Sequence, residues 1–164
     1  MTAWWRKNKN DDYSTPVEYL EIINKYVSID AVICDPFYMN GSVKEEWKKL
    51  NRDILHNDTD FFESYYDCDI FISNPPYSNL LDVFRRFFQL GKPWALLIPI
   101  QKICQLKIQK EIKDKDLQVI ISPIYKGFIN SKGEATRCPS QYMAWVCWGM
   151  NLERDLMFVW CSSR

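Results

Sequence analysis

The apolar positions of this chain follow two periods, one typical of helices and one typical of buried strands. Apolar residues recur every three to four positions over 80–90, which predicts an amphipathic helix that ends at Gly91. Short apolar runs bounded by polar or turn-forming residues predict strands. The expected strands are 29–34, 69–73, 94–98, 117–121 and 142–148, with a brief candidate at 53–56.

Helices are expected between these strands. Ser14-Thr15-Pro16 resembles a hydroxyl N-cap followed by Pro in the first helical turn, and further helices are predicted over 43–50 and 101–112. Strands and helices alternate without internal repeats, which predicts an α/β fold with a mostly parallel, doubly wound sheet flanked by helices. We expect one domain over 1–164, in which the polar residues 1–12 form a flexible N-terminus.

Charge is balanced overall but unevenly distributed. Lys plus Arg and Asp plus Glu number 21 each, which argues against a protein that holds nucleic acid by bulk charge alone. The segment 53–82 carries seven acids and no Lys or Arg, whereas 101–137 carries eight bases and four acids. Any binding of a polyanion is therefore expected in the second half of the chain.

The cysteines and the single histidine limit the candidate chemistry. The six cysteines are far apart in the sequence and His56 is the only histidine, so no metal site is expected. Unpaired cysteines in apolar surroundings favour a reducing intracellular compartment, either the cytoplasm or the nucleus. The longest apolar runs are too short to span a membrane, and no signal peptide is visible.

The most informative stretch is Ser73-Asn74-Pro75-Pro76-Tyr77, which directly follows the expected strand 69–73. It has two interpretations. Asn-Pro and Pro-Pro are turn formers that commonly close strands. Alternatively, two prolines fix the backbone so that a carbonyl and the Asn74 side chain hold an amino group beyond the carboxyl end of a strand, where ligands bind in open α/β sheets.

Asn74-Pro75-Pro76-Tyr77 resembles the catalytic motif of S-adenosylmethionine-dependent amino-group methyltransferases. The resemblance spans roughly residues 13–148 and is greatest to compact DNA N6-adenine methyltransferases, including short forms from phages and large DNA viruses. It implies a Rossmann-like class I methyltransferase fold, S-adenosylmethionine as cofactor, and methyl transfer to the N6 amino group of adenine in DNA. No separate target-recognition domain is visible.

Four further stretches resemble the cofactor-binding motifs of the same family, in the order that the family requires. Thr15-Pro16 resembles the motif that touches the methionine end, and Asp35-Pro36-Phe37 with Gly41 resembles the turn after the first strand. Asp58 matches the acid that binds ribose hydroxyls, and Asp60-Phe61 matches the pair that meets the adenine. Each stretch also has a structural interpretation, as a helix start, a strand end or solvated caps. The turn departs from the family pattern because it offers a single glycine.

The resemblance also implies roles in the reaction. The Asn74 side-chain oxygen and the Pro75 carbonyl would each accept a hydrogen bond from an N–H group of the target amine and offset its developing positive charge, while Tyr77 stacks on the base. Reaching N6 within a duplex requires base flipping, so the strand must be held. Phosphate contacts are expected from Lys126, Lys132 and Arg137, and Tyr142 is expected at the pocket. Lysines of this kind are also common on purely solvated surfaces.

Other functions remain open at this point. The same motif occurs in methyltransferases that act on amino groups of adenine or guanine in RNA, or on a protein glutamine, because all present a planar nitrogen. The chain is alternatively a non-catalytic methyltransferase-like subunit that binds nucleic acid or a catalytic partner. DNA is the expected partner, RNA is an alternative, and a protein partner or a second copy of the chain is a candidate source of sequence specificity.

Overall fold

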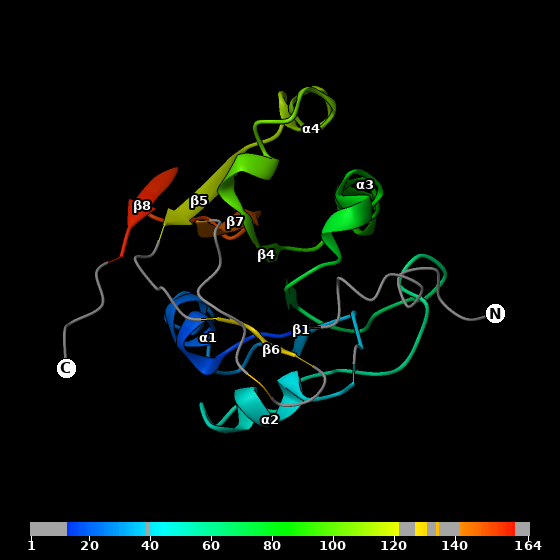
Figure 1. Cartoon of the computed structure of the whole chain (residues 1–164), viewed down its shortest axis with the longest axis vertical. Coiled ribbons are helices and arrows are strands. Elements are labelled where there is room, and N and C mark those ends of the chain that lie inside the picture. Colours follow the sequence, from blue (N-terminus) through cyan, green and yellow to red (C-terminus); the bar gives the residue numbers. More distant parts are fainter. Residues whose placement is uncertain (1–12, 39, 122–126, 131–133, 135–141, 160–164) are drawn as a thin grey trace.

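The computed structural model describes residues 13–38, 40–121, 127–130, 134 and 142–159. Figure 1 shows the elements coloured along the sequence. In chain order, with η for 3-10 helices, they are β1 (Tyr13–Ser14), α1 (Val17–Asn24), β2 (Ile33–Cys34), α2 (Val43–Lys48), β3 (Ile70–Ser73), η3 (Tyr77–Asn79), α3 (Leu80–Leu90), β4 (Trp94–Pro99), η4 (Ile100–Lys102), α4 (Leu106–Ile112), β5 (Leu117–Ile121), β6 (Ile129–Asn130), β7 (Met143–Trp148) and β8 (Leu156–Phe158).

The main sheet has six strands in the order β2-β3-β4-β7-β5-β8. Its parallel pairs are β2 with β3, β3 with β4 and β5 with β8, whereas β7 is antiparallel to both of its neighbours. All of its strands except β7 therefore run in one direction, which confirms the predicted α/β fold with a mostly parallel sheet. Outside this sheet, β1 and β6 form a separate antiparallel pair.

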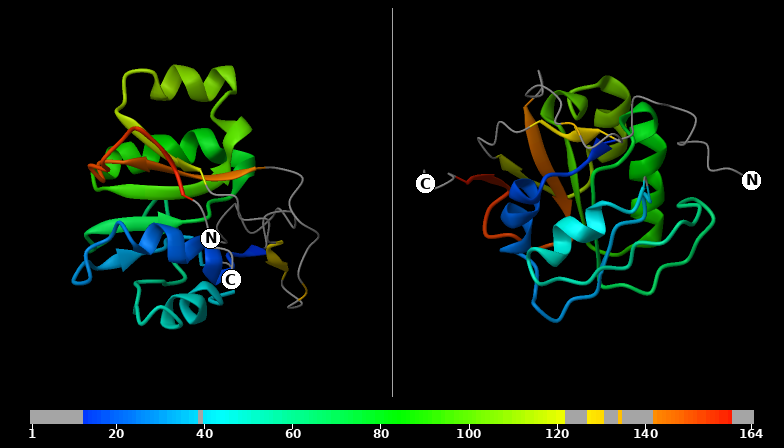
Figure 2. Two further views of the ribbon diagram at one scale, coloured as in Figure 1. Left: turned by 90° about the vertical axis from the view of Figure 1, so that its left-hand side faces the viewer. Right: turned by 60° about the horizontal axis from the view of Figure 1, so that its bottom comes forward.

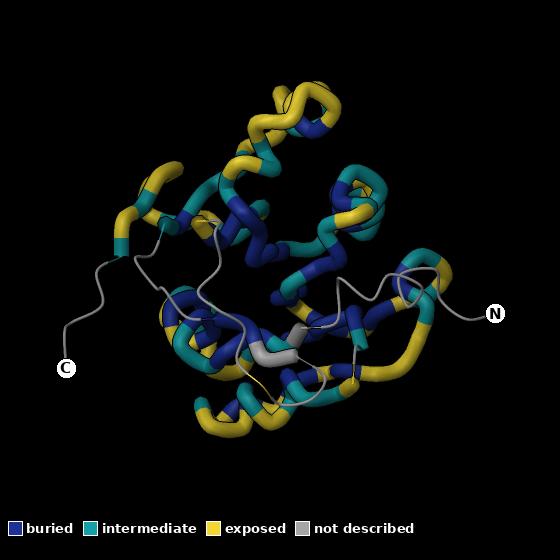
Figure 3. Tube along the Cα trace, in the orientation of Figure 1, coloured by how far each residue is buried: buried dark blue, intermediate teal, exposed yellow. Residues whose placement is uncertain are grey.

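The core consists of two apolar layers, one on each face of the sheet. Helices α3 and α4 bury Leu80, Phe84 and Ile108 in one layer, and α1 and α2 bury Ile23 and Trp47 in the other. The two views of Figure 2 show these helix pairs on opposite sides of the strands. Because both faces are covered, the central strands are apolar along their whole length, and every residue of β4 is buried (Figure 3).

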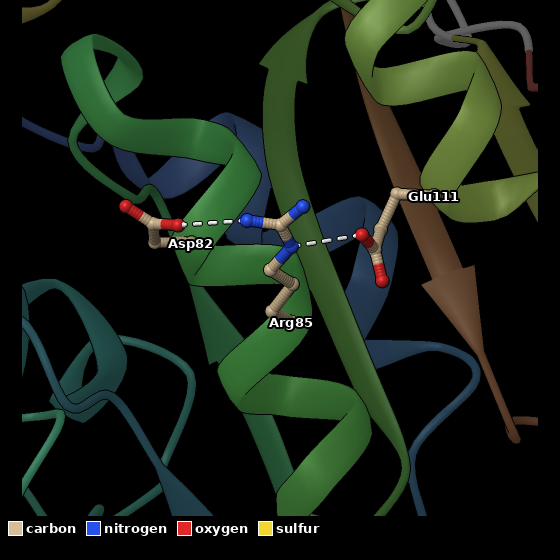
Figure 4. A network of polar contacts seen from close by, with 3 residues as sticks. All are labelled: Asp82, Arg85 and Glu111. Carbon is tan, nitrogen blue, oxygen red and sulfur yellow. Dashed lines mark hydrogen bonds and ion pairs between the residues drawn. The ribbon is translucent and has the colours of Figure 1, made fainter.

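Helix α3 has the boundaries that its sequence pattern predicts. Its apolar residues lie on one buried face, and it ends at Gly91, whose φ of 66° is the left-handed conformation favoured at a helix C-terminus. On its outer face, Arg85 donates to Glu111 of α4 at 2.9 Å and contacts Asp82 at 3.4 Å (Figure 4). This exposed network joins the two helices of one layer and adds little to stability compared with the buried face.

The segment after α1 is held by one buried arginine. The guanidinium of Arg52 donates to the Asn24 side chain at 2.8 Å, to the carbonyl of Ile29 at 2.5 Å and to the carbonyl of Val27 at 2.9 Å. Arg52 is only 6% exposed. Its guanidinium therefore satisfies two carbonyls of the segment between α1 and β2, and it fixes the path of that segment.

Several elements differ from the sequence prediction. The strand expected over 29–34 is reduced to β2, and the candidate at 53–56 is a single bridge between Leu55 and Cys34. The helix expected over 101–112 is divided into η4 and α4, because Gln105 has an extended backbone with ψ of 132°. β1, β6 and β8 are too short to give a periodic signal, and the sequence did not predict them.

Candidate active site

The carboxyl ends of β2 and β3 form the centre of the candidate site. Leu55 bridges β2 on one side, and β3 pairs with β2 on the other side. The chain order therefore reverses between β2 and β3, which is the topological switch point where ligands bind in open α/β sheets. Asp35 directly follows β2 and Asn74 directly follows β3, so a carboxyl group and a carboxamide meet at this edge of the sheet.

A small pocket lies at this switch point. Its cavity volume is only about 10 Å³, and the empty space rises to about 260 Å³ when the part open to solvent is included. That interior space is enough for about one water molecule. The pocket is lined by Ser14, Thr15, Asp35, Phe37, Asn40, Gly41, Ser42, Val43, His56 and Asn74.

Asp35 is the acidic group of the pocket, although its residue is only 5% exposed. Its Oδ1 accepts a hydrogen bond from the Ser73 hydroxyl at 2.6 Å and from the backbone N–H of Phe37 at 3.1 Å. Burial raises the pKa of Asp35 above its ordinary value of 3.8, while the neighbouring His56 and the two hydrogen bonds act in the opposite direction. The carboxyl group is therefore strongly oriented and costly to ionise without a partner.

Asn74 and Tyr77 are joined by a hydrogen bond within the Pro-Pro motif. The Tyr77 hydroxyl donates to Oδ1 of Asn74 and lies 3.4 Å from the carbonyl oxygen of Leu97. Pro75 and Pro76 are buried, and Pro76 has an extended backbone (φ −64°, ψ 119°) before η3 begins. The Tyr77 ring packs against both apolar layers. The motif thus holds the Asn74 amide in one orientation at the pocket.

The Thr15-Pro16 stretch lies at the pocket but does not cap α1 as expected. Thr15 is 3% exposed and lines the pocket. The helix begins at Val17, and Pro16 occupies the N-cap position without a side-chain hydrogen bond. The predicted hydroxyl cap is therefore wrong, because the chain is still extended at Pro16 (φ −60°, ψ 146°).

Gly41 has a backbone that other residues rarely adopt. Its φ is +78°, and a Cβ at this position would lie 2.8 Å from the Tyr38 hydroxyl oxygen. The Tyr38 ring in turn lies 4.9 Å from the His56 ring, centroid to centroid. The glycine therefore allows Tyr38 to lie close beside the loop wall of the pocket. Pro36, from the same predicted motif, is buried between Asp35 and Phe37.

Five residues of the expected cofactor motifs are not among the lining residues of this pocket: Pro16, Pro36, Asp58, Asp60 and Phe61. Asp58 is exposed. Asp60 accepts a hydrogen bond from the backbone N–H of Phe62 at 2.9 Å, which stabilises the turn that follows it. Phe61 is fully buried, with its ring centroid 4.8 Å from that of Phe37 and 4.6 Å from that of Phe87. In this structure Phe61 therefore belongs to the core beside the site.

Of the residues expected to contact nucleic acid, Tyr142 is described and Lys126, Lys132 and Arg137 lie outside the described residues. Tyr142 is 65% exposed, and its carbonyl accepts a hydrogen bond from the N–H of Ile100 at 2.9 Å. Because β7 is antiparallel to β4, Tyr142 lies at the same edge of the sheet as Asn74.

Six residues at or beside the pocket were not predicted from the sequence to contact a ligand or the reacting groups: Ser73, which contacts Asp35, and the lining residues Ser14, Asn40, Ser42, Val43 and His56. Ser73 positions Asp35, and its only signal is that it ends the strand before the Pro-Pro motif. His56 lines the pocket, and its only signal is that the single histidine ends a strand candidate. Within the described residues, no group of three or more His, Cys, Asp or Glu is arranged to hold a metal ion, and no helix is long and apolar enough to cross a membrane.

Comparisons with known proteins give no match in sequence and only a distant likeness in fold. No protein-family model matches the sequence, and no curated protein matches it significantly. Among solved structures, the chain is similar to a modification subunit of a putative type I restriction enzyme from Vibrio vulnificus YJ016, with a TM-score of 0.43 and 11% identity. The match covers 84% of this chain and 44% of that one, so the chain spans less than half of its length.

Proposed function

We propose that the chain is an S-adenosylmethionine-dependent methyltransferase of the Rossmann-like class I fold that methylates the N6 amino group of adenine in DNA. One observation carries the proposal. Thr15, Asp35, Gly41 and Asn74 resemble successive motifs of one family, and they line a single pocket although they come from separate stretches of the chain. The pocket lies at the switch point of the sheet, where a ligand is expected on topological grounds alone.

The residues of the pocket fit the chemistry of this cofactor, which carries a cationic amine and ribose hydroxyls. Asp35 supplies an acidic acceptor. Within the described residues, the Ser14 hydroxyl oxygen and Nε2 of His56 are buried without a hydrogen-bond partner, so both are available to a polar ligand. The cavity volume of about 10 Å³ holds about one water molecule, so the pocket must widen to admit the whole cofactor.

The cofactor supplies an activated methyl group when it is bound, and the chain has to hold the amine in line with it. Asn74 Oδ1 already accepts a hydrogen bond from Tyr77, and a carbonyl oxygen has a second lone pair for an amine N–H. The proposed role of Tyr77 therefore includes orienting the Asn74 amide. Because Asn74 is neutral, water would remove the proton after the transfer.

The choice of adenine in DNA rests on the resemblance of Asn74-Pro75-Pro76-Tyr77 to the DNA enzymes. The exposed Tyr142 at the same edge of the sheet supports a planar substrate there, because aromatic side chains stack on extruded bases. Lys126, Lys132 and Arg137 remain proposed phosphate contacts, and Asp58, Asp60 and Phe61 remain proposed cofactor contacts that require the pocket to extend beyond its present lining.

The test is transfer of labelled methyl groups from the cofactor to separate pools of DNA, RNA and protein. We expect label in DNA, recovered as N6-methyladenine, and a loss of about 10²-fold or more in Asn74→Ala. The matched control is Asn57→Ala, at an exposed residue outside the pocket lining. Label in RNA or protein alone would contradict DNA as the substrate. Unaltered label in Asn74→Ala would contradict the catalytic role of the motif. Absence of cofactor binding in calorimetry would favour a non-catalytic subunit.

A further inference from the structure

His56 is a buried histidine at the edge of the sheet where the candidate site lies. It follows Leu55, the residue that bridges β2, and it is only 6% exposed. The backbone of this short segment is held on both sides of the bridge, because the Leu55 N–H donates to Ile33 at 2.8 Å and the Asp35 N–H donates to Leu55 at 3.0 Å. The position of His56 is therefore fixed relative to Asp35.

The one hydrogen bond that the His56 ring makes to a described residue defines its tautomer. Nδ1 lies 2.9 Å from the backbone carbonyl oxygen of Asp35. A carbonyl oxygen only accepts hydrogen bonds, so Nδ1 must carry the hydrogen. In the neutral ring, Nε2 then has a lone pair and is an acceptor. The contact with the Tyr38 ring, at 4.9 Å between centroids, restricts rotation of the imidazole.

This acceptor has no donor among the described residues, although it is buried and His56 lines the pocket. A buried polar atom without a partner is rare in folded proteins, and it indicates a water molecule or a ligand group at that position. The pocket has room for about one water molecule, which can satisfy the acceptor when no ligand is bound. A bound ligand that displaces this water must bring a donor of its own.

The charges of the pocket indicate the kind of donor. A cationic amine is attracted to the carboxyl group of Asp35, the acidic residue of the lining. A neutral imidazole acceptor is better matched to a neutral hydroxyl. The Ser14 hydroxyl is a second buried group in the same lining without a partner among the described residues, so the pocket can bind more than one hydroxyl.

We infer that Nε2 of His56 accepts a hydrogen bond from a ribose hydroxyl of the nucleoside ligand bound at Asp35. This inference rests on the proposed function, because it assumes a ligand that contains a nucleoside. It assigns to His56 a contact that the sequence had led us to expect from Asp58, which is exposed and is not among the lining residues. His56 is thus a specificity-determining residue for ligands with an intact ribose.

The test is calorimetric binding of S-adenosylhomocysteine and of its 2′-deoxy and 3′-deoxy analogues to the full chain. For the protein without substitutions, we expect one of the two analogues to bind about tenfold more weakly than the parent, the effect of one hydrogen bond. His56→Asn can retain the donor to the Asp35 carbonyl but lacks an acceptor at the position of Nε2. This variant should bind the parent about tenfold more weakly and lose the discrimination against that analogue. His56→Gln, whose amide reaches further, should restore part of the affinity for the parent and part of the discrimination.

The outcomes separate the two proposals. If the unsubstituted protein binds the parent and both analogues equally, or if His56→Asn discriminates as the unsubstituted protein does, the role of His56 is excluded and the proposed function stands. If the unsubstituted protein binds none of these ligands, the proposed function fails and the inference fails with it. Thermal unfolding of each variant shows whether a weaker affinity reflects lost folding, and the comparison of analogues on the unsubstituted protein needs no variant.

Discussion

The Ser73 hydroxyl donates a hydrogen bond of 2.6 Å to Oδ1 of Asp35, and this contact joins the last residue of β3 to the first residue after β2. Asn74 is the next residue along the chain. A single contact therefore links the acidic group of the pocket to the stretch that carries the proposed catalytic amide. A change at either residue is expected to affect both.

Replacement of Ser73 tests this link. Ser73→Ala removes a donor from a buried carboxyl group, so we expect the free energy of unfolding to fall by about 1–3 kcal/mol in urea denaturation. Ser28→Ala is the matched control, because Ser28 is exposed and its hydroxyl accepts only a 3.4 Å hydrogen bond. The control should change stability by less than about 0.5 kcal/mol. Similar losses in the two variants would contradict the link.

Asp35→Asn should change how stability depends on pH. Burial raises the folded-state pKa of Asp35 above 3.8, so the contribution of this group to stability is complete below that value and is lost as the pH rises through the folded-state pKa. The amide of the variant does not ionise, and its oxygen can still accept from Ser73 and Phe37. The variant should therefore gain stability relative to the unsubstituted protein as the pH rises.

This pH dependence is measured by urea denaturation at several pH values between about 3 and 8, the range over which a carboxyl group with a raised pKa ionises. Asp116→Asn, at an exposed position, is the control and should show no such trend. The cofactor should bind Asp35→Asn more weakly, since the acidic acceptor is lost. If the stability difference between the variant and the unsubstituted protein is constant across this range, ionisation of Asp35 does not cost the folded state stability.

Tyr77→Phe separates the hydroxyl of the motif from its ring. The hydroxyl orients Asn74, so we expect methyl transfer to fall by about tenfold, the effect of one hydrogen bond on a barrier. Cofactor affinity should change by less than about twofold, because Tyr77 is not among the lining residues of the pocket. Tyr77→Ala should lose much more activity, since it also removes the ring. Equal rates for the Phe variant and the unsubstituted protein would exclude the orienting role.

Gly41→Ala and Gly91→Ala form a matched pair. Both glycines have positive φ, at +78° and +66°, so each substitution should cost about 1–2 kcal/mol of stability. A Cβ at Gly91 meets no atom within 4 Å, whereas a Cβ at Gly41 would lie 2.8 Å from the Tyr38 hydroxyl oxygen. Only Gly41→Ala should displace Tyr38 and weaken ligand binding in calorimetry. Unchanged binding in that variant would show that the pocket tolerates the shift.

Alkylation by iodoacetamide should distinguish the described cysteines. Cys147 is buried, and burial raises its pKa to about 12, whereas Cys104 is exposed. Because the thiolate is the reactive form, we expect Cys104 to react in the folded protein and Cys147 to react only in denaturant. Mass spectrometry of the labelled peptides measures both. Rapid labelling of Cys147 without denaturant would contradict its burial.

The sequence predicted the parts of the fold that depend on local pattern. The periodic run of α3 and the apolar run of β5 have the boundaries that were expected. An apolar run does not encode direction, so the antiparallel course of β7 was not predicted. Strand length was also overestimated, because the backbone N–H of Val32 bonds to the Asp69 side chain at 2.8 Å and not to a neighbouring strand.

The candidate site was predictable where motifs lie at strand ends. Asp35 and Asn74 follow two strands, so their meeting at one edge follows from parallel pairing. The orientation of the His56 ring at the pocket depends on a hydrogen bond to the carbonyl of Asp35, 21 residues away, and no local sequence signal predicts that contact. The burial of Phe61 is similar, because the packing of a loop in three dimensions decides which of the adjacent Phe61 and Phe62 enters the core.

The position of β7 between β4 and β5 has a consequence for synthesis of the chain. Strand β4 pairs with β3 and β7, and β5 pairs with β7 and β8, so the ribosome releases β4 and β5 before either has its central partner. Until Met143–Trp148 emerges, each has an unpaired apolar edge, and such edges recruit other chains. Nascent chains truncated before Met143 should therefore aggregate, and chaperones would be needed late in translation.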